Sequence, residues 1–77
     1  MSQQHLNLHG YYLYYDNYDD VRYGIDYLYT LGQGEFDTLI DAAKADGTAE
    51  YHDQKYGGHY LIKYDTQYKT FSIEKTG

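Results

Sequence analysis

The chain contains no cysteine, no proline and no tryptophan, and basic residues are scarce. Without cysteine, no disulfide can brace the fold and no zinc site of the Cys-cluster type can form. Six Lys and Arg residues stand against twelve Asp and Glu residues, which gives a formal net charge of −6. Because proteins neutralise nucleic-acid phosphate with Lys and Arg, this charge argues against direct binding to DNA or RNA.

Long apolar runs are also missing. Residues 1–20 lack the basic start and the apolar stretch of a signal peptide. No segment approaches the roughly 20 apolar residues that cross a membrane as a helix. The absence of cysteine is also typical of a reducing compartment. We therefore expect a soluble, cytoplasmic protein that is not associated with a membrane.

Large aliphatic residues are few for a chain of 77 residues. Seven Leu, four Ile and one Val are joined by Phe36 and Phe71. These side chains can form one small core, whose stability is marginal without added support. We therefore expect residues 1–77 to form a single small domain that is stabilised by tyrosine rings, by a second chain, or by both.

Tyrosine is abundant where other large side chains are scarce, because thirteen of the residues are Tyr. A tyrosine ring has an apolar body and a polar tip, so it can complete a core or coat a binding surface. We expect about half of the rings to supplement the core, because tyrosines are usually partly buried. The others would face solvent, a partner subunit or a ligand.

Negative charge is concentrated in the first part of the chain. Residues 1–54 hold ten Asp and Glu against Arg22 and Lys44, whereas residues 55–77 hold two acids and four lysines. Such an asymmetry predicts one acidic face. The simplest role of that face would be to keep the protein soluble through like charge.

Hydrophobic periodicity predicts an α+β fold of two layers, with one helix packed on a mostly antiparallel sheet in the order β-β-α-β-β-β. The expected strands are 6–15, 21–30, 48–53, 59–64 and 69–75, and the expected helix is 35–45, ended by Gly47 in a left-handed conformation. Residues 1–5 are polar and are expected to be disordered. The open face of such a sheet would carry a broad tyrosine surface.

The expected first strand, 6–15, is unusual because it carries apolar side chains on both of its faces. A strand of this kind is covered on both sides of the sheet or lies in an interface. Gly10 lies inside it and is expected to mark a bulge.

Residues 18–31 fit two patterns. Alternating apolar residues indicate a strand, and they are Val21, Tyr23, Ile25, Tyr27 and Tyr29. A helical stripe fits as well, and its members are Tyr18, Val21, Ile25 and Leu28. Asn17 would then cap the helix and Gly32 would end it. Most residues of the segment are weak helix formers, so we favour the strand and keep the helix as the alternative.

The final hairpin carries a local sequence motif. Residues 64–71 read Tyr-Asp-Thr-Gln-Tyr-Lys-Thr-Phe, with an aromatic residue and Asp before a short polar loop and Lys-Thr-Phe after it. This segment resembles the second hairpin of the immunoglobulin-binding domain of protein G. The resemblance covers eight residues and implies the chemistry of a turn, without any function.

Residues with catalytic or metal-binding potential form no recognisable site in the sequence. His5 and His9 do not converge in an extended segment, and the spacing of His52 and His59 does not supply the three or four ligands of a metal site. No serine lies in a glycine-flanked nucleophile elbow, and no phosphate-binding loop is present. We therefore expect no catalytic residues, no metal and no cofactor, and a protein that is not an enzyme.

The remaining feature is a set of acidic and aromatic residues between positions 16 and 41. Tyrosine is a preferred interface residue, and carboxylates on a rigid frame can imitate the charge spacing of nucleic-acid phosphates. The predicted partner-binding residues are Asp16, Tyr18, Asp19, Asp20, Tyr23, Asp26, Asp37 and Asp41. The leading hypothesis is an inhibitor that occludes a protein partner with a basic surface, such as a nucleic-acid-binding enzyme.

This hypothesis has a compositional parallel and two alternatives. In size, charge and lack of catalytic groups, the chain resembles small acidic inhibitors of phage or plasmid origin, including DNA mimics. Alternatively, tyrosine-coated strands could pair or stack to form a homodimer, which would be the folded unit. Stacked tyrosines could also receive a sugar ring as a small ligand.

Overall fold

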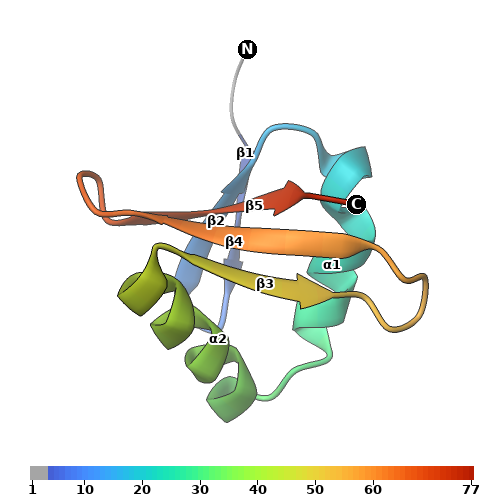
Figure 1. The fold of residues 1–77 in the computed structure, drawn as a ribbon, viewed down its shortest axis with the longest axis horizontal. Helices are drawn as coiled ribbons and strands as arrows, with labels where there is room; N and C mark the ends of the chain where they lie inside the picture. The colour runs from blue at the N-terminus through green and yellow to red at the C-terminus, as the bar shows by residue number, and fades with distance from the viewer. Residues whose placement is uncertain (1–3) are drawn as a thin grey trace.

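The computed structural model describes residues 4–77, which form five strands and two helices. In chain order they are β1 (Gln4–Leu8), β2 (Tyr11–Tyr15), α1 (Tyr18–Tyr29), α2 (Gln33–Asp46), β3 (Thr48–His52), β4 (His59–Asp65) and β5 (Thr70–Lys75). The strands form one sheet in the order β1-β2-β5-β4-β3 (Figure 1). The β2–β5 pair is parallel and the other pairs are antiparallel.

The predicted α+β class is confirmed, and the predicted order of elements is corrected. A second helix replaces the expected second strand, and the expected first strand is two strands, so the observed order is β-β-α-α-β-β-β. Gln4 and His5, which were expected to be disordered, belong to β1. Residues 1–3 lie outside the described residues.

The hydrophobic core lies between the sheet and the two helices, which contribute their buried faces to the same cluster. Its buried members are Leu8, Leu13, Val21, Ile25, Leu28, Phe36, Ile40, Ala43, Ala49, Ile62, Phe71 and Ile73. The strand residues among them follow the two-residue alternation of a sheet with one covered face. The opposite face of the sheet is not covered by either helix.

Residues 6–15 form a tight hairpin because His9 and Gly10 make a two-residue turn. Both residues have positive φ angles, 53° and 87°, as the two central positions of a type I′ turn require. The turn reverses the chain, so Leu6 pairs with Leu13 and both face the core. The apolar residues on both apparent faces therefore belong to two paired strands, and Gly10 marks a turn where a bulge was expected.

The segment after β2 folds as the helix α1, the alternative that propensity had disfavoured. The Asn17 side chain accepts a hydrogen bond from the Asp19 backbone N–H at 3.0 Å, which caps the first turn. Val21, Ile25 and Leu28 are buried in the core on one face of the helix. Tertiary burial of this stripe outweighs the weak helix propensity of the intervening residues.

The helix α1 approaches the sheet closely at Gly24. A methyl group at this position would lie only 2.7 Å from Cδ1 of Tyr60, which is 2% exposed on β4. Gly58 similarly lies close to the hydroxyl end of the Tyr60 ring. Absence of a side chain at these two glycines therefore makes room for one large aromatic ring beneath the helix.

The remaining elements follow the sequence-based predictions. The predicted helix 35–45 is observed as α2, and Gly47 ends it with a φ angle of 87°. The β4–β5 hairpin forms around Asp65, whose carboxylate accepts hydrogen bonds from the backbone N–H groups of Gln67 and Tyr68 at 2.8 and 3.3 Å. Within residues 4–77, neither helix is long and apolar enough to cross a membrane.

Substitution of Gly24 tests the close approach of α1 to Tyr60. Alanine is intrinsically the better helix former by about 1 kcal/mol, but its methyl group would overlap the Tyr60 ring. We expect Gly24→Ala to lower the free energy of unfolding by about 1–3 kcal/mol, as measured by urea denaturation. The matched control is Gly34→Ala in α2, where nothing lies within 4 Å of the added methyl group. This control should be neutral or stabilising, and an equally stable Gly24→Ala protein would contradict the packing argument.

Candidate interaction surface on the helical layer

The net negative charge of the protein resides in its helical layer. The helices α1 and α2 carry seven Asp and Glu residues against Arg22 and Lys44. Residues 47–77, which form β3, β4, β5 and their connections, carry four acids and four lysines. The face formed by the helices is therefore acidic, while the strands that follow them in the chain are neutral on balance.

Three of the predicted residues form a stripe along the outer side of α1. Asp19, Tyr23 and Asp26 are spaced four and three residues apart, which places them on one side of a helix. Asp19 and Asp26 are exposed, and Tyr23 is half-buried. The structure therefore brings these three residues together opposite the buried face of α1.

The other predicted residues near the start of α1 lie to either side of this stripe. Asp16 and Asp20 line a hollow of about 260 Å³ together with Glu74 and Lys75 at the end of β5. Tyr18 packs on the opposite flank, with its ring centroid 5.9 Å from that of Tyr15, and it is 42% exposed. The three residues therefore do not extend the stripe of Asp19, Tyr23 and Asp26.

The two predicted residues on α2 are separated from those on α1. Asp37 accepts a hydrogen bond from the Gln33 side chain at 2.9 Å, and the same Gln33 amide donates to the His9 carbonyl oxygen at 3.5 Å. Asp37 thus lies on the flank of α2 that faces the β1–β2 turn, and Asp41 is exposed further along the helix. The eight predicted residues therefore occupy several parts of the helical layer and do not form one continuous strip.

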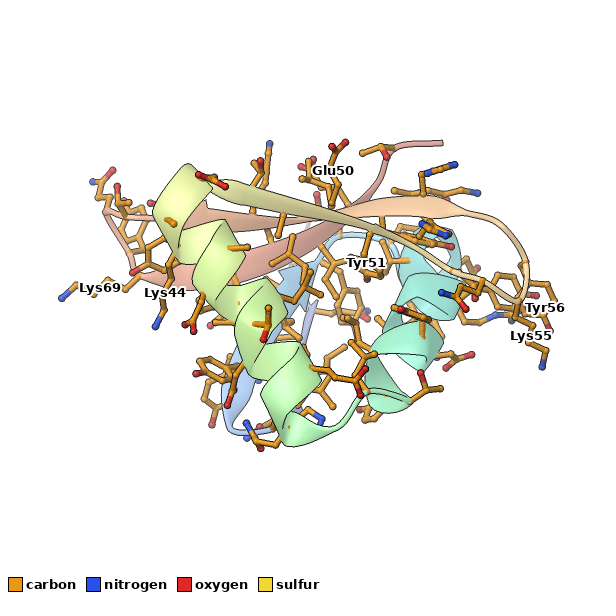
Figure 2. The ribbon with its side chains drawn as sticks, turned by 60° about the horizontal axis from the view of Figure 1, so that its bottom comes forward. Lys44, Glu50, Tyr51, Lys55, Tyr56 and Lys69 are labelled. Carbon is orange, nitrogen blue, oxygen red and sulfur yellow. The ribbon has the colours of Figure 1, made fainter. Side chains whose placement is uncertain are left out.

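Between the helices lies an apolar hollow that the sequence did not reveal. It has a volume of about 270 Å³, and Leu31, Leu39, Ala42 and Tyr51 line it together with Tyr27. Glu35 and Thr38 lie at its border. Figure 2 shows the ring of Tyr51 in the space between α2 and α1.

A second hollow lies between α1 and the β3–β4 loop. Its volume is about 350 Å³, and Tyr23, Tyr27 and Tyr56 supply its aromatic wall. The carboxylates of Asp26 and Asp53 also border it. Tyr27 lines both hollows, so the two are neighbours, and together we call them the tyrosine groove.

Stacked rings hold the base of the tyrosine groove. The ring centroids of Tyr27 and Tyr51 are 5.7 Å apart with nearly parallel planes, and those of Tyr51 and Tyr60 are 5.6 Å apart. The Tyr51 hydroxyl donates a hydrogen bond to the Gly24 carbonyl oxygen at 3.1 Å. The stacking and this hydrogen bond restrict how the Tyr51 ring can turn, so the base of the groove is present in the protein alone.

The outer end of the groove is built by a stack that includes two cations. Tyr23 and Tyr56 have ring centroids 4.1 Å apart. The Arg22 guanidinium lies 4.8 Å from the Tyr23 ring centroid, and the Lys55 ammonium lies 5.3 Å from that of Tyr56. Neither cation is among the predicted partner-binding residues, so the charge around Tyr23 is mixed where an acidic surface was expected.

The hydrogen bond from Arg22 to the Tyr23 hydroxyl fixes the orientation of this stack. The guanidinium donates to the hydroxyl oxygen at 2.7 Å. This hydrogen bond raises the pKa of Arg22 above its ordinary value. Arg22 therefore remains a cation beside the groove at any physiological pH.

Asp53 organises the loop that presents Tyr56. Its carboxylate is 3% exposed and accepts hydrogen bonds from the backbone N–H groups of Lys55 and Tyr56 at 2.9 and 3.2 Å. Its backbone N–H donates to the Gly58 carbonyl oxygen at 2.8 Å. A buried carboxylate is stable when such hydrogen bonds satisfy it. Asp53 thus positions the loop through these hydrogen bonds. Lys55 and Tyr56 lie on this loop (Figure 2).

The distribution of the tyrosines corrects the expected aromatic sheet face. Five rings pack partly buried against the core, from Tyr11, Tyr15, Tyr27, Tyr51 and Tyr64, and Tyr60 is fully buried. Of the tyrosines on the described strands, only Tyr12 and Tyr14 face the uncovered side of the sheet, where the His5 ring packs against both of them. The broad tyrosine surface therefore lies on the helical layer and not on the open face of the sheet.

Burial of the stacked Tyr51 and Tyr60 rings makes the free energy of unfolding sensitive to alkaline pH. Burial raises the pKa of Tyr51 far above its ordinary value of 10.0, and the neighbouring Tyr60 and Tyr27 add to the rise. Burial, followed by the charge of Asp53, also raises the pKa of Tyr60. The unfolded chain therefore loses these protons near pH 10 while the folded chain keeps them. The stabilisation is complete below pH 10 and is lost as the pH rises above it.

Urea unfolding at a series of pH values between about 9 and 11.5 tests this dependence. We expect the free energy of unfolding to fall above pH 10 by up to about 1.4 kcal/mol per pH unit from Tyr51, with Tyr60 adding to the fall in the same direction. Tyr51→Phe should lose about 1 kcal/mol at neutral pH, because its hydrogen bond to Gly24 is gone. The same variant should show a clearly smaller alkaline slope, and a slope equal to that of the parent protein would disprove the assignment.

Comparisons with known proteins identify no family for this chain. No protein-family model, no curated protein and no solved structure matches it. Because the fold class by itself does not determine function, the function of the protein is inferred from the geometry and charge of its helical layer.

Proposed function

We propose that the protein is a binding module that occludes a basic protein partner through its helical layer. The observation that supports this proposal most directly is the tyrosine groove, an apolar and aromatic groove on the face that carries the net negative charge. Such a face is complementary to a partner segment with one apolar side and flanking Lys or Arg residues.

The groove supplies the short-range part of the interaction. Interface energy is concentrated in a few aromatic or apolar anchors that enter preformed, water-excluding pockets. Tyr56 is 58% exposed and Tyr23 and Tyr27 are half-buried, so these rings offer area to a partner without unfolding the core. Because stacking already holds the rings, binding costs little side-chain entropy.

The carboxylates supply the long-range, electrostatic part of the interaction with the partner. Asp26 on α1 and Glu35 on α2 line the groove, Asp19 lies on the same side of α1 as Asp26, and the acidic helical layer attracts positive charge. Complementary potentials accelerate encounter and exclude like-charged partners more than they add affinity. A surface of this kind would compete for the basic groove of a nucleic-acid-binding protein, which is how a DNA mimic inhibits its target.

Nuclear magnetic resonance titration with defined peptides tests the proposal. The probes are a Leu–Lys amphipathic peptide and a Leu–Glu peptide of the same length. We expect the Lys peptide to shift the amide signals of Tyr23, Tyr27 and Tyr56, and the Glu peptide to leave them unchanged. Binding should weaken strongly between about 0.05 and 0.5 M salt, because exposed charges are screened.

Two variants separate the charge contribution from the anchor contribution. The double variant Asp19→Asn with Asp26→Asn should raise Kd about fivefold at low salt, with no effect at high salt. Tyr56→Ala should raise Kd about fivefold or more at any salt concentration, because an exposed anchor is lost.

The matched control is Glu50→Gln, which removes one negative charge on the uncovered face of the sheet, away from the helices (Figure 2). Its Kd should equal that of the parent protein. If Glu50→Gln weakened binding as much as the single variant Asp26→Asn, net charge alone would explain the interaction. The groove would then have no role in it.

A further inference from the structure

We propose that His52 and His59 form a chelating site for a divalent transition-metal ion such as Cu²⁺ or Zn²⁺ on the uncovered face of the sheet. The site lies on the side of the sheet opposite the tyrosine groove and is independent of the proposed function. It rests on the juxtaposition of two imidazoles that are seven positions apart in the sequence but directly opposite in the structure.

The register of the β3–β4 hairpin brings the two side chains together. His52 is paired with His59, and the two ring centroids are 5.8 Å apart. The next residues along the hairpin, Asp53 and Gly58, share a backbone hydrogen bond of 2.8 Å. Hydrogen-bonded and non-hydrogen-bonded pairs alternate in an antiparallel ladder, so His52 and His59 occupy a non-hydrogen-bonded pair. Side chains approach most closely at such positions.

The backbone on either side of the pair is held firmly. The His59 backbone N–H donates to the Gly77 carbonyl oxygen at 3.0 Å, and the His59 carbonyl oxygen accepts from the Thr76 N–H at 2.8 Å. His59 thus lies on a strand with neighbours on both sides. Both rings are exposed and can turn about χ1 and χ2 without disturbing the ladder.

The surroundings of the pair suit a metal ion with bound water. His52 and His59 line a hollow of about 400 Å³, and Glu50 adds a carboxylate to the same hollow from two residues earlier on β3. Within residues 4–77, no group of three or more His, Cys, Asp or Glu side chains has the geometry of a metal site. The site is therefore an open one, with two imidazole ligands from the protein and water in the other positions.

The chemistry of the ligands determines which ions bind. Imidazole nitrogen suits Cu²⁺, Ni²⁺ and Zn²⁺, with bonds to Zn²⁺ of about 2.0–2.1 Å, whereas Mg²⁺ and Ca²⁺ prefer oxygen. Because the chain has no cysteine, no thiolate competes for these ions. Affinity should follow the order Cu²⁺ above Zn²⁺, with no binding of Mg²⁺.

Calorimetric titration of the whole chain with Cu²⁺, Zn²⁺ and Mg²⁺ measures this order. The variants His52→Gln and His59→Gln should each lower Cu²⁺ affinity by roughly 100-fold, because a single imidazole loses the advantage of chelation. The matched control is His5→Gln, an exposed histidine on β1 whose ring neighbours are Tyr12 and Tyr14. This control should bind Cu²⁺ as the parent protein does.

A second measurement does not depend on any variant. Paramagnetic Cu²⁺ broadens the resonances of nearby protons, so substoichiometric Cu²⁺ should broaden the His52 and His59 ring signals and the Thr76 amide signal first. Broadening centred on other residues would overturn the proposal. Unchanged Cu²⁺ affinity in either His52→Gln or His59→Gln would overturn it as well.

Discussion

The contact between Gly24 of α1 and the ring of Tyr60 determines how the helical layer rests on the sheet. A residue without a side chain lets the helix descend onto a buried aromatic ring, and the Gly24 carbonyl oxygen then lies within reach of the Tyr51 hydroxyl. This hydrogen bond orients Tyr51, whose ring stacks on Tyr27 and Tyr60. The base of the tyrosine groove therefore depends on the close approach of the α1 backbone to the sheet. A helix held farther from the sheet would separate the stacked rings of Tyr27, Tyr51 and Tyr60.

Tyrosine serves both the core and the surface because its ring and its hydroxyl have different preferences. In a chain with few aliphatic residues, rings such as Tyr51 and Tyr60 complete the core, and the hydrogen bond of the Tyr51 hydroxyl to Gly24 restricts how its ring lies. Rings such as Tyr56 remain exposed and stack on half-buried neighbours such as Tyr23. The same residue type thus connects the packed interior to the acidic outer surface, which explains how a domain this small can present a rigid groove.

Local signals in the sequence predicted the elements whose turns and caps carry distinctive chemistry. The helix α2 ends at Gly47, and the β4–β5 hairpin turns at Asp65, as their residue types indicate. Whether residues 18–29 form a helix or a strand depends on burial against Tyr60, which lies 36 positions after Gly24. No local sequence pattern contains this contact. The groove and the His52–His59 pair arise from strand register and helix placement, so sequence spacing alone could not reveal either of them. The signal that was available and overlooked was His9-Gly10 between two alternating segments, which is compatible with a tight hairpin turn.

The position of β5 within the sheet has a consequence for how the chain is made. β5 is the last strand along the chain, yet it lies between β2 and β4 and pairs with both of them. During synthesis, the β1–β2 hairpin and the β3–β4 hairpin therefore remain two separate halves of the sheet. Each half has unpaired backbone N–H and C=O groups along one strand edge. Only the pairing of β5 with both β2 and β4 joins them, so the sheet becomes one cooperative unit through contacts between segments that lie far apart in the sequence.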